Sequence, residues 1–258
     1  MSDAEELAAL EQRLATVRAR RGYLLPHHGL LALAFPDLLA GYDAAYSAMA
    51  LADRVLSHHD REFVWLAVLA ATDEALATHH IARLRAAGGS DATIEAAFAA
   101  CAGALGGKAH DFAARDWSAQ LAPWNPRAAY LRGVRRLAPL PLVHLAQCAV
   151  HVCKAQWRVL EWQIAAAYED GVAEDAIAEA LTLAMFPGSV PRFVEACGVW
   201  LRMIQAGTLA ASPRYRAWAR LAGQGGYDES GGAAMQRTST SSDAAAPPSG
   251  SPAGGPAP

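Results

Sequence analysis

Glycine and proline cut this chain into apolar segments that have the length of helices rather than of strands. Gly88-Gly89 and Pro187-Gly188 each follow such a segment, where they are expected to end a helix. Within the segments apolar residues recur every three or four positions, as at Leu7, Leu10 and Leu14. Alanine dominates the 53% of apolar residues and β-branched residues are sparse, which favours closely packed helices. The sequence therefore predicts an all-α fold.

Helix start and stop signals give the expected helices their bounds. Thr72 and Asp73 are expected to cap one helix and Ser90 the next, and Gly106-Gly107 is expected to end that next helix. A short apolar segment, 28–35, precedes the helix that Pro36 opens. The expected helices are 3–20, 36–50, 60–71, 72–87, 91–105, 142–154, 155–169 and 174–185.

The helical pattern is repeated in the second half of the chain. A shift of 83 residues, from Gly88 to Gly171, also brings Ile81 onto Ile164, and helix, glycine stop and next helix recur in the same order. This predicts an internal duplication whose two units pack about a pseudo-two-fold axis. A proline-bracketed turn at 123–126 marks the connection between the units.

The predicted organisation has three parts. Residues 1–122 form the first helical repeat with an N-terminal helix. Residues 123–222 form a second, diverged repeat packed on the first. The composition changes to Ser, Thr, Ala, Pro and Gly over residues 223–258, which predicts a disordered tail, because such a segment has too little apolar surface to offset the entropy of ordering.

The charge and the apolar pattern of the sequence limit which binding partners and which cellular compartment are expected. The formal net charge is −3 without a block of like charges, so neither nucleic acid nor an anionic membrane is expected as a partner. No apolar run approaches the roughly 20 residues of a membrane span, and the polar N-terminus is unlike a signal peptide. The four cysteines form no C-x-x-C pair and are expected to be small buried residues. The protein is predicted to be soluble and cytoplasmic.

Two glutamates and a histidine pair stand out in an otherwise apolar stretch. Glu62 precedes the apolar run 63–71, and Glu74 and His79-His80 follow it. A carboxylate buried beside an imidazole costs desolvation free energy unless the two are paired. Active sites use such pairs for general acid–base catalysis. Glu62, Glu74 and His80 are therefore the candidate catalytic residues.

A family resemblance rests on the same stretch. Arg61-Glu62 opens an apolar helix, a carboxylate follows, and Gly88 stands eight residues after His80. This pattern resembles the carboxymuconolactone decarboxylase and alkylhydroperoxidase D-like family, well over roughly residues 20–110 and weakly over 140–205. The resemblance implies an alkylhydroperoxidase D-like helical bundle. It also implies a homo-oligomer, because the family's helices typically pack across subunits.

The sequence departs from the family pattern in two places. Peroxidase-type members carry C-x-x-C ahead of the histidine, whereas Asp73 and Leu76 occupy those positions here. Dithiol peroxide reduction therefore lacks its reacting thiolate. In the second half, Gln163 takes the place of the histidine and Trp157 that of Glu74. The second copy is expected to keep its packing role without the chemistry.

The resemblance implies a cofactor-free, carboxy-lyase-like enzyme without a redox dithiol. Its reaction would be decarboxylation, isomerisation or lactone conversion of a small oxo or carboxylated molecule. His80 would move the proton, with Glu62 or Glu74 holding its tautomer. Substrate-binding candidates are His28 and His79 at the pocket and Arg61, which could receive a carboxylate bidentately, as could Arg83. An alkylhydroperoxidase-like oxidoreductase and a non-catalytic oligomeric binding scaffold remain as alternatives.

Each candidate also has a structural interpretation. His80 would be a hydrogen-bonded core histidine, Glu62 an anchor for Arg61 or for another helix, and Glu74 a charge at a helix start. His79 would lie at the surface or at an interface. On one continuous helix Asp73 would share a face with His80, whereas Glu74 would point about 120° away. No HxH or HxxxH spacing brings two histidines together, and no metal site is predicted.

Overall fold

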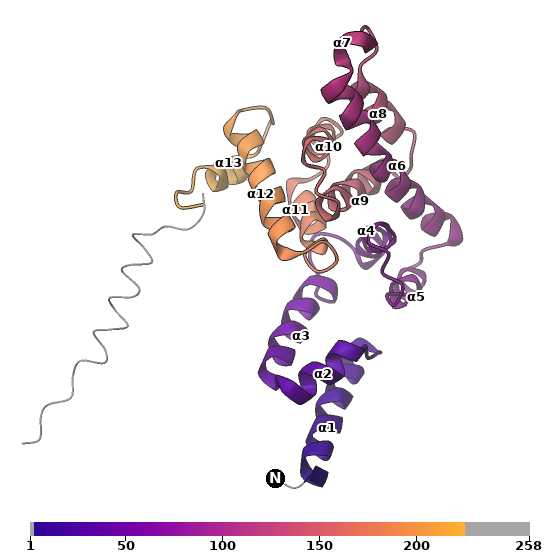
Figure 1. Cartoon of the computed structure of the whole chain (residues 1–258), viewed down its shortest axis with the longest axis vertical. Coiled ribbons are helices and arrows are strands. Elements are labelled where there is room, and N and C mark those ends of the chain that lie inside the picture. Colours follow the sequence, from indigo (N-terminus) through magenta and orange to yellow (C-terminus); the bar gives the residue numbers. More distant parts are fainter. Residues whose placement is uncertain (1–2, 225–258) are drawn as a thin grey trace, which may run out of the picture.

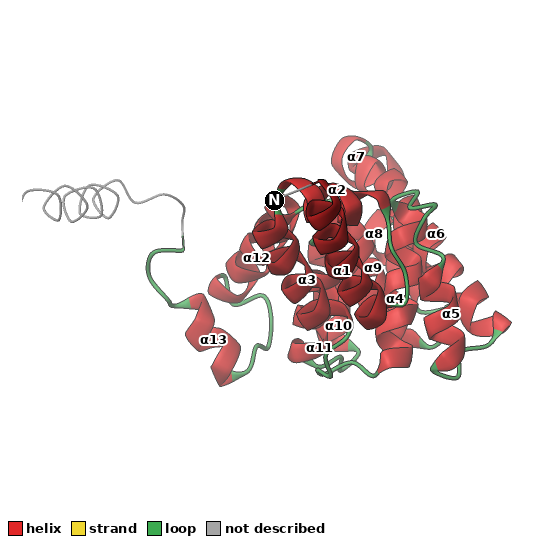
Figure 2. Cartoon of the chain, turned by 90° about the horizontal axis from the view of Figure 1, so that it is seen from below, coloured by secondary structure: helices red, strands yellow, loops and turns green. Residues whose placement is uncertain are grey.

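The computed structural model describes residues 3–224, and within this range the chain is built from helices without a strand (Figures 1 and 2). The predicted all-α fold is confirmed. The tail predicted over residues 223–258 lies, from residue 225 on, outside the described residues. The helices are α1 (Asp3–Arg21), α2 (Pro26–Ala34), α3 (Pro36–Ala50), α4 (His58–Ala71), α5 (His79–Ala86), α6 (Asp91–Asp116), α7 (Ser118–Leu121), α8 (Pro126–Val134), α9 (Leu140–Cys153), α10 (Trp157–Glu169), α11 (Glu174–Leu183), α12 (Val190–Gln205) and α13 (Pro213–Ala219).

Polar side chains start several of these helices. In each case the side-chain oxygen accepts a hydrogen bond from the backbone N–H three residues further on, which satisfies one of the free donors of the first turn. The capping residues are Ser57, Ser90, Asn125, Ser189 and Ser212. The predicted cap at Ser90 is among them.

The core is built around α4 and α9, which pack against each other and against α6, α10 and α11. Every residue of α9 from Leu142 to Cys153 is buried, and so is every residue of α4 from Arg61 to Val68. Helices that are buried on all sides are apolar all round, which explains the weak amphipathic pattern of these two segments.

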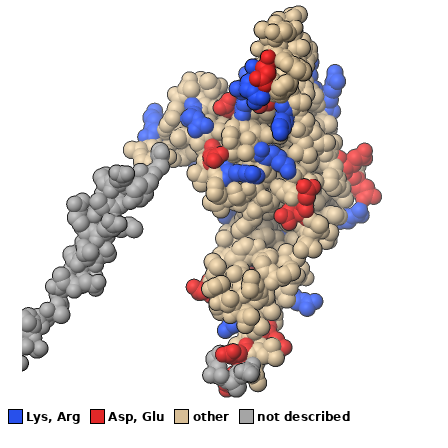
Figure 3. Space-filling model, viewed as in Figure 1, with Lys and Arg blue, Asp and Glu red and all other residues tan. Residues whose placement is uncertain are grey.

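Helices α1 to α3 form an arm that projects from this body (Figure 1). The arm has a small core of its own, in which Val17, Ala32 and Leu39 are buried. Figure 3 shows charged side chains of both signs scattered over the body, without a large patch of one sign on that face. Within residues 3–224, no helix combines the length and the apolarity needed to cross a bilayer.

Two predicted helix bounds are wrong. The helix expected over 72–87 begins only at His79, because Thr72 ends α4 and its hydroxyl donates back to the Val68 carbonyl at 3.0 Å. Asp73 then adopts a φ of 58°, a left-handed conformation that ends a helix. Asp73 and Glu74 therefore belong to a turn, and the argument from one continuous helix face does not apply to them.

The second wrong bound is the end of α6, which continues through Gly106-Gly107 to Asp116. A Cβ on Gly107 would lie 2.9 Å from Cγ1 of Val159, and one on Gly103 would lie 2.7 Å from Nε2 of Gln147. These glycines therefore allow α6 to approach α9 and α10 closely, instead of ending the helix.

Helix bounds recur between the two halves. Helix α9 begins and ends 82 residues after α4, and α11 begins 83 residues after α6. Gly88 and Gly171, which end α5 and α10, both have positive φ, 91° and 78°. This order agrees with an internal duplication. The pseudo-two-fold axis and the domain bounds at residues 122 and 222 stay predictions.

Candidate functional site

Glu62 and His80 form a buried pair between α4 and α5. Nδ1 of His80 lies 2.6 Å from Oε2 of Glu62, and the two residues are 2% and 3% exposed. Because an ionised carboxylate has no proton to donate, the neutral form of the imidazole carries its proton on Nδ1 and keeps a lone pair on Nε2. Among the described residues, no hydrogen bond reaches Nε2 of His80.

Aromatic rings pack on the His80 imidazole. The Trp65 ring lies 4.8 Å from it and the His79 ring 4.3 Å, measured between ring centroids. Trp65 stands one helical turn after Glu62 in α4, so both side chains face α5. The imidazole is therefore held in one orientation by packing as well as by the carboxylate.

The arm meets the body beside this pair. The Tyr23 ring stacks on the His79 ring at 3.9 Å, and its hydroxyl donates to the Tyr46 hydroxyl at 3.0 Å. Arg83 of α5 donates to the same Tyr46 hydroxyl at 3.1 Å. We call this contact region, formed by Arg21, Tyr23 and Tyr46 with His79, the arm junction.

Arg21 lies at the centre of the arm side of the junction. Its guanidinium carbon is 4.1 Å from the centroid of the Tyr46 ring, and its side chain is 1% exposed. Nε donates to Asp43 at 2.7 Å, and Nη1 lies 3.1 Å from Nε2 of His28. His28 is fully buried, and its Nδ1 accepts from the Leu25 backbone N–H at 2.9 Å.

The histidines of the junction are held neutral. Burial, followed by the charges of neighbouring His80, Arg83 and Arg21, lowers the pKa of His79 to about 3. Burial also lowers the pKa of His28 to about 4, with further contributions from His27 and Arg21. Burial therefore disfavours the charged form of both rings, and the neighbouring arginine charges add to that effect.

Arg61 has a structural role. It is fully buried, and its Nε donates to Oε1 of Glu179 on α11 at 3.1 Å. Its two terminal nitrogens donate to the carbonyls of Ala50 and Leu56. All its nitrogens therefore have protein partners, and the residue is inaccessible to solvent.

Glu74 lies apart from the pair. It is exposed in the turn between α4 and α5, and no hydrogen bond or ion pair joins it to His80. With Asp73 it lines a surface pocket between that turn and Phe98 of α6. Of the three predicted catalytic residues, the fold brings two together, and of the predicted substrate-binding residues it brings His28 and His79 to the arm junction.

Sequence reasoning missed Arg21, Tyr23 and Trp65. Trp65 could have been found, because it shares a helix face with Glu62 at a spacing of three residues. Nothing in the sequence indicates that Arg21 and Tyr23 fold back onto α5. Their contact depends on how the arm turns at α3.

The second half holds a polar pair at matching positions. His144 stands 82 residues after Glu62, and Gln163 stands 83 residues after His80. Nε2 of Gln163 lies 2.7 Å from Nδ1 of His144, whose Nε2 lies 2.9 Å from Oδ2 of Asp170. Both ring nitrogens of His144 are therefore engaged by the protein.

A network extends from this second pair. The Tyr130 hydroxyl oxygen lies within 3.2 Å of Oε1 of Gln163, Oε1 of Gln147 and Nε2 of His151. Nδ1 of His151 lies 2.8 Å from Oε1 of Gln156, and burial lowers the pKa of His151 to about 4. The side chains of Tyr130, Gln147, His151 and Gln163 are all buried, and the hydroxyl of Tyr130 lies at the centre of their contacts.

Thiols contribute little reactivity. Burial raises the pKa of Cys101, Cys148, Cys153 and Cys197, that of Cys153 to about 12. Each thiol is therefore protonated near neutral pH and a poor nucleophile. Within residues 3–224, no three His, Cys, Asp or Glu side chains are grouped closely enough to hold a metal ion.

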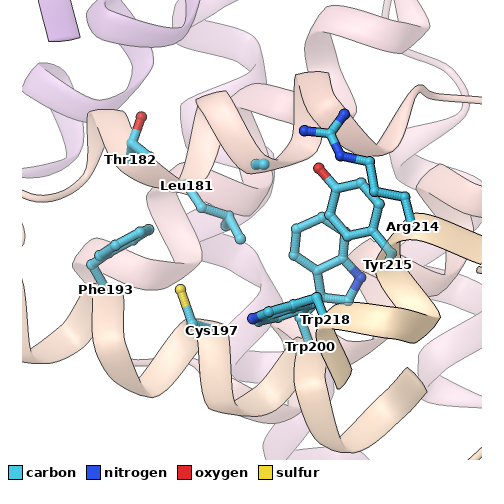
Figure 4. Close-up of a pocket in the computed structure, with 9 residues that line it drawn as sticks. Leu181, Thr182, Phe193, Cys197, Trp200, Arg214, Tyr215 and Trp218 are labelled. Carbon is cyan, nitrogen blue, oxygen red and sulfur yellow. The ribbon is translucent and has the colours of Figure 1, made fainter. Parts of the chain in front are cut away.

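An apolar pocket lies elsewhere, between α11, α12 and α13 (Figure 4). It has a volume of about 340 Å³, and the sulfur of Cys197 points towards its space between Leu181 and Phe193. Neither Glu62 nor His80 lines it, and it holds no paired acid and base. Its aromatic walls are Phe193, Trp200, Tyr215 and Trp218.

Comparison with known proteins adds one finding. The model of the carboxymuconolactone decarboxylase family matches residues 36–119, which run from the start of α3 to α7 and include Glu62 and His80. No curated protein and no solved structure matches the chain.

Proposed function

We propose that this protein is an enzyme that moves a proton on a small oxo or carboxylated molecule, with His80 as the acid–base group; the match of residues 36–119 to the model of the carboxymuconolactone decarboxylase family supports this proposal. The observation that carries the proposal is the 2.6 Å contact between Nδ1 of His80 and Glu62, which leaves Nε2 with a lone pair. A carboxylate that orients an imidazole in this way also stabilises the imidazolium formed when Nε2 takes a proton.

The reaction follows from that geometry. Nε2 of His80 removes a proton from a carbon next to a carbonyl group, and the C–H electron pair moves onto the carbonyl oxygen as an enolate. Returning the proton to the same carbon gives exchange with solvent, and returning it to a neighbouring carbon gives isomerisation. In a decarboxylation Nε2 of His80 first takes a proton from solvent. The C–C bond to the carboxylate then breaks, its electron pair moves onto the carbonyl oxygen as an enolate, CO₂ leaves, and the imidazolium protonates the carbon.

Burial favours this chemistry. Glu62 and His80 are nearly inaccessible, and the rings of Trp65 and His79 pack against the imidazole. In a site that excludes water, the attraction between imidazolium and carboxylate is stronger than in solution. The Glu62–His80 pair is therefore suited to hold charge that appears only during the reaction.

The redox alternative has less support. Asp73 and Leu76 stand where a reactive C-x-x-C would be, and burial raises the pKa of each of the four thiols. One observation supports the scaffold alternative. The second half carries a buried polar pair, His144 and Gln163, at the matching positions, and neither ring nitrogen of His144 is free. Activity measurements separate these alternatives from acid–base catalysis.

The test is deuterium exchange of carbon-bound hydrogens, followed by NMR over a panel of small oxo acids and lactones. Wild type is expected to exchange at least one substrate. His80→Ala is expected to lose that activity while retaining its helical circular dichroism, and Glu62→Gln to reduce it. Equal activity of wild type and folded His80→Ala would overturn the role of His80.

A further inference from the structure

Buried polar atoms without a partner are concentrated where the arm meets the body. Within the described residues, five buried side-chain atoms have no hydrogen-bond partner. Three of them, Nη2 of Arg21, Nε1 of Trp65 and Nε2 of His79, belong to the arm junction or to the rings on His80. A buried unpaired donor is destabilising, so a group of them indicates a missing acceptor.

These atoms belong to one continuous set of contacts. Arg21 packs on the Tyr46 ring, Tyr46 bonds to Tyr23, and Tyr23 stacks on His79. His79 in turn packs on the His80 ring, against which the Trp65 ring also lies. The guanidinium of Arg21 is thus linked, through two tyrosines and a histidine, to the ring that carries the free Nε2.

The charges of this region are unbalanced. Arg21 and Arg20 both pair with Asp43, and no carboxylate pairs with Arg83 among the described residues. Glu62, the other acid of the site, is bonded to His80. Buried Arg21 therefore shares its one carboxylate partner and Arg83 has none within residues 3–224, so these two arginines favour binding of an anion.

We propose that the arm junction is the binding site for the carboxylate of the substrate, with the buried guanidinium of Arg21 as its principal donor. The inference deepens the proposed function, because the arm junction contacts the His80 ring through His79. Arg21 has a terminal nitrogen free for the ligand, whereas all the nitrogens of Arg61 have protein partners.

The titration of the junction histidines is consistent with such a site. The charge of Arg21 contributes to the lowered pKa of His27, His28 and His79, after the larger effect of burial. These rings stay uncharged at neutral pH, so the fixed arginine charges are what an anion meets. A bound carboxylate supplies a negative charge, which would raise the pKa of His79.

The experiment compares one ligand with and without its charge. Levulinate, a small oxo acid, and its uncharged methyl ester are titrated into the full chain by calorimetry at constant ionic strength. Wild type is expected to bind levulinate saturably and the ester on the order of tenfold more weakly, since a charge-assisted hydrogen bond is lost. Absence of saturable levulinate binding, or equal binding of the ester, overturns the proposal.

Neighbouring arginines provide a matched control. Arg21→Gln removes the buried guanidinium, whereas Arg20→Gln removes a half-exposed one that pairs with the same carboxylate of Asp43. Arg21→Gln is expected to weaken levulinate binding at least about tenfold, and Arg20→Gln to leave it within about twofold. Equal weakening in the two variants would show that general charge, and not the site, attracts the ligand.

A variant that is expected to bind levulinate more tightly provides a control for misfolding, because a misfolded protein would bind more weakly. Asp43→Asn removes the internal carboxylate that competes for Arg21, so it is expected to tighten levulinate binding severalfold. If Asp43→Asn weakens binding as much as Arg21→Gln, the ion pair only shapes the arm and the proposal fails. His80→Ala is expected to bind levulinate but not to exchange protons, so loss of the acid–base role and loss of the carboxylate site are distinguishable.

Discussion

The pair in α4 and α5 and the pair in α9 and α10 occupy corresponding positions but leave different atoms free. In the first half, Glu62 bonds to one nitrogen of His80 and the other nitrogen has no partner among the described residues. In the second half, Gln163 and Asp170 engage both nitrogens of His144. A buried imidazole becomes available for chemistry when the protein leaves one nitrogen open, and becomes structural when it satisfies both.

The surroundings of the two pairs also differ in whether their buried polar atoms have hydrogen-bond partners. The first pair lies beside the arm junction, where Arg21, His79 and Trp65 have buried atoms without partners. In the second half, no buried side-chain nitrogen or oxygen of the Tyr130 network lacks a hydrogen-bond partner among the described residues. Unsatisfied groups persist in native proteins mainly where a ligand or water completes them, so we expect the first half to carry the function and the second half to serve as its rigid support.

The largest predicted difference between the halves is in activity. His80→Ala is expected to lower proton exchange by about 10²- to 10⁴-fold, the usual contribution of a positioned acid–base group. Gln163→Ala, the matched change in the second half, is expected to leave the exchange rate per folded molecule unchanged. NMR exchange rates of both purified variants, corrected for the folded fraction, test this. A comparable loss in Gln163→Ala would show that the two pairs act together.

The next prediction concerns acid stability of the second network. Burial lowers the pKa of His151 to about 4, whereas an unfolded histidine titrates near 6.5. Between these values the unfolded chain binds more protons, so the free energy of unfolding decreases as pH falls from about 6.5 to 4. The contribution of His151 reaches about 3 kcal/mol at the acid end.

Urea unfolding at several pH values measures that contribution. His151→Gln cannot titrate, so its free energy of unfolding is expected to decline less steeply than that of wild type between pH 6.5 and 4. His28 and His79 titrate in both proteins and cancel in the difference. Parallel stability curves for wild type and His151→Gln would mean that His151 is not held neutral by the fold.

A smaller effect is expected from removing the amide of Gln163. Gln163→Leu leaves Nδ1 of His144 buried without a donor, which is expected to cost about 1–3 kcal/mol of unfolding free energy. Gln205→Leu is the matched control, because exposed Gln205 makes one hydrogen bond, to the Ala219 carbonyl. Its cost is expected to stay below about 1 kcal/mol. Equal midpoints in urea for the two variants would contradict a stabilising role of the network.

The sequence predicted the parts of the fold that depend on local signals. The start of α3 is set by Pro36 and the start of α6 by the Ser90 cap. Such features involve residues close together in the chain, and their physical causes are visible in the sequence itself.

Long-range contacts could not be predicted in the same way. Arg61 carries the charge expected of a substrate-binding residue, but its partner Glu179 lies 118 residues away. In the sequence, Arg21 is one of several basic residues at the end of α1. Only the fold of the arm shows that its guanidinium packs on the Tyr46 ring. Which arginine is buried with a free nitrogen depends on how distant helices pack, and one sequence contains no direct signal of that.

The smallest predicted effects come from two adjacent glycines in α6, the segment where a helix end was wrongly predicted. Buried Gly107 touches the second network, and a Cβ there would lie 2.9 Å from Val159 and 3.2 Å from His151. Gly107→Ala is therefore expected to destabilise the fold by about 1 kcal/mol or more, because the clash exceeds the gain in helix propensity. A Cβ on Gly106 meets nothing within 4 Å, so Gly106→Ala is expected to stabilise by about 0.5–1 kcal/mol. Urea midpoints shifting in opposite directions would show that the second half is packed around its polar network. Stabilisation by both alanines would show that α6 can move away from α9 and α10, and would remove the argument that this half serves as the rigid support of the first.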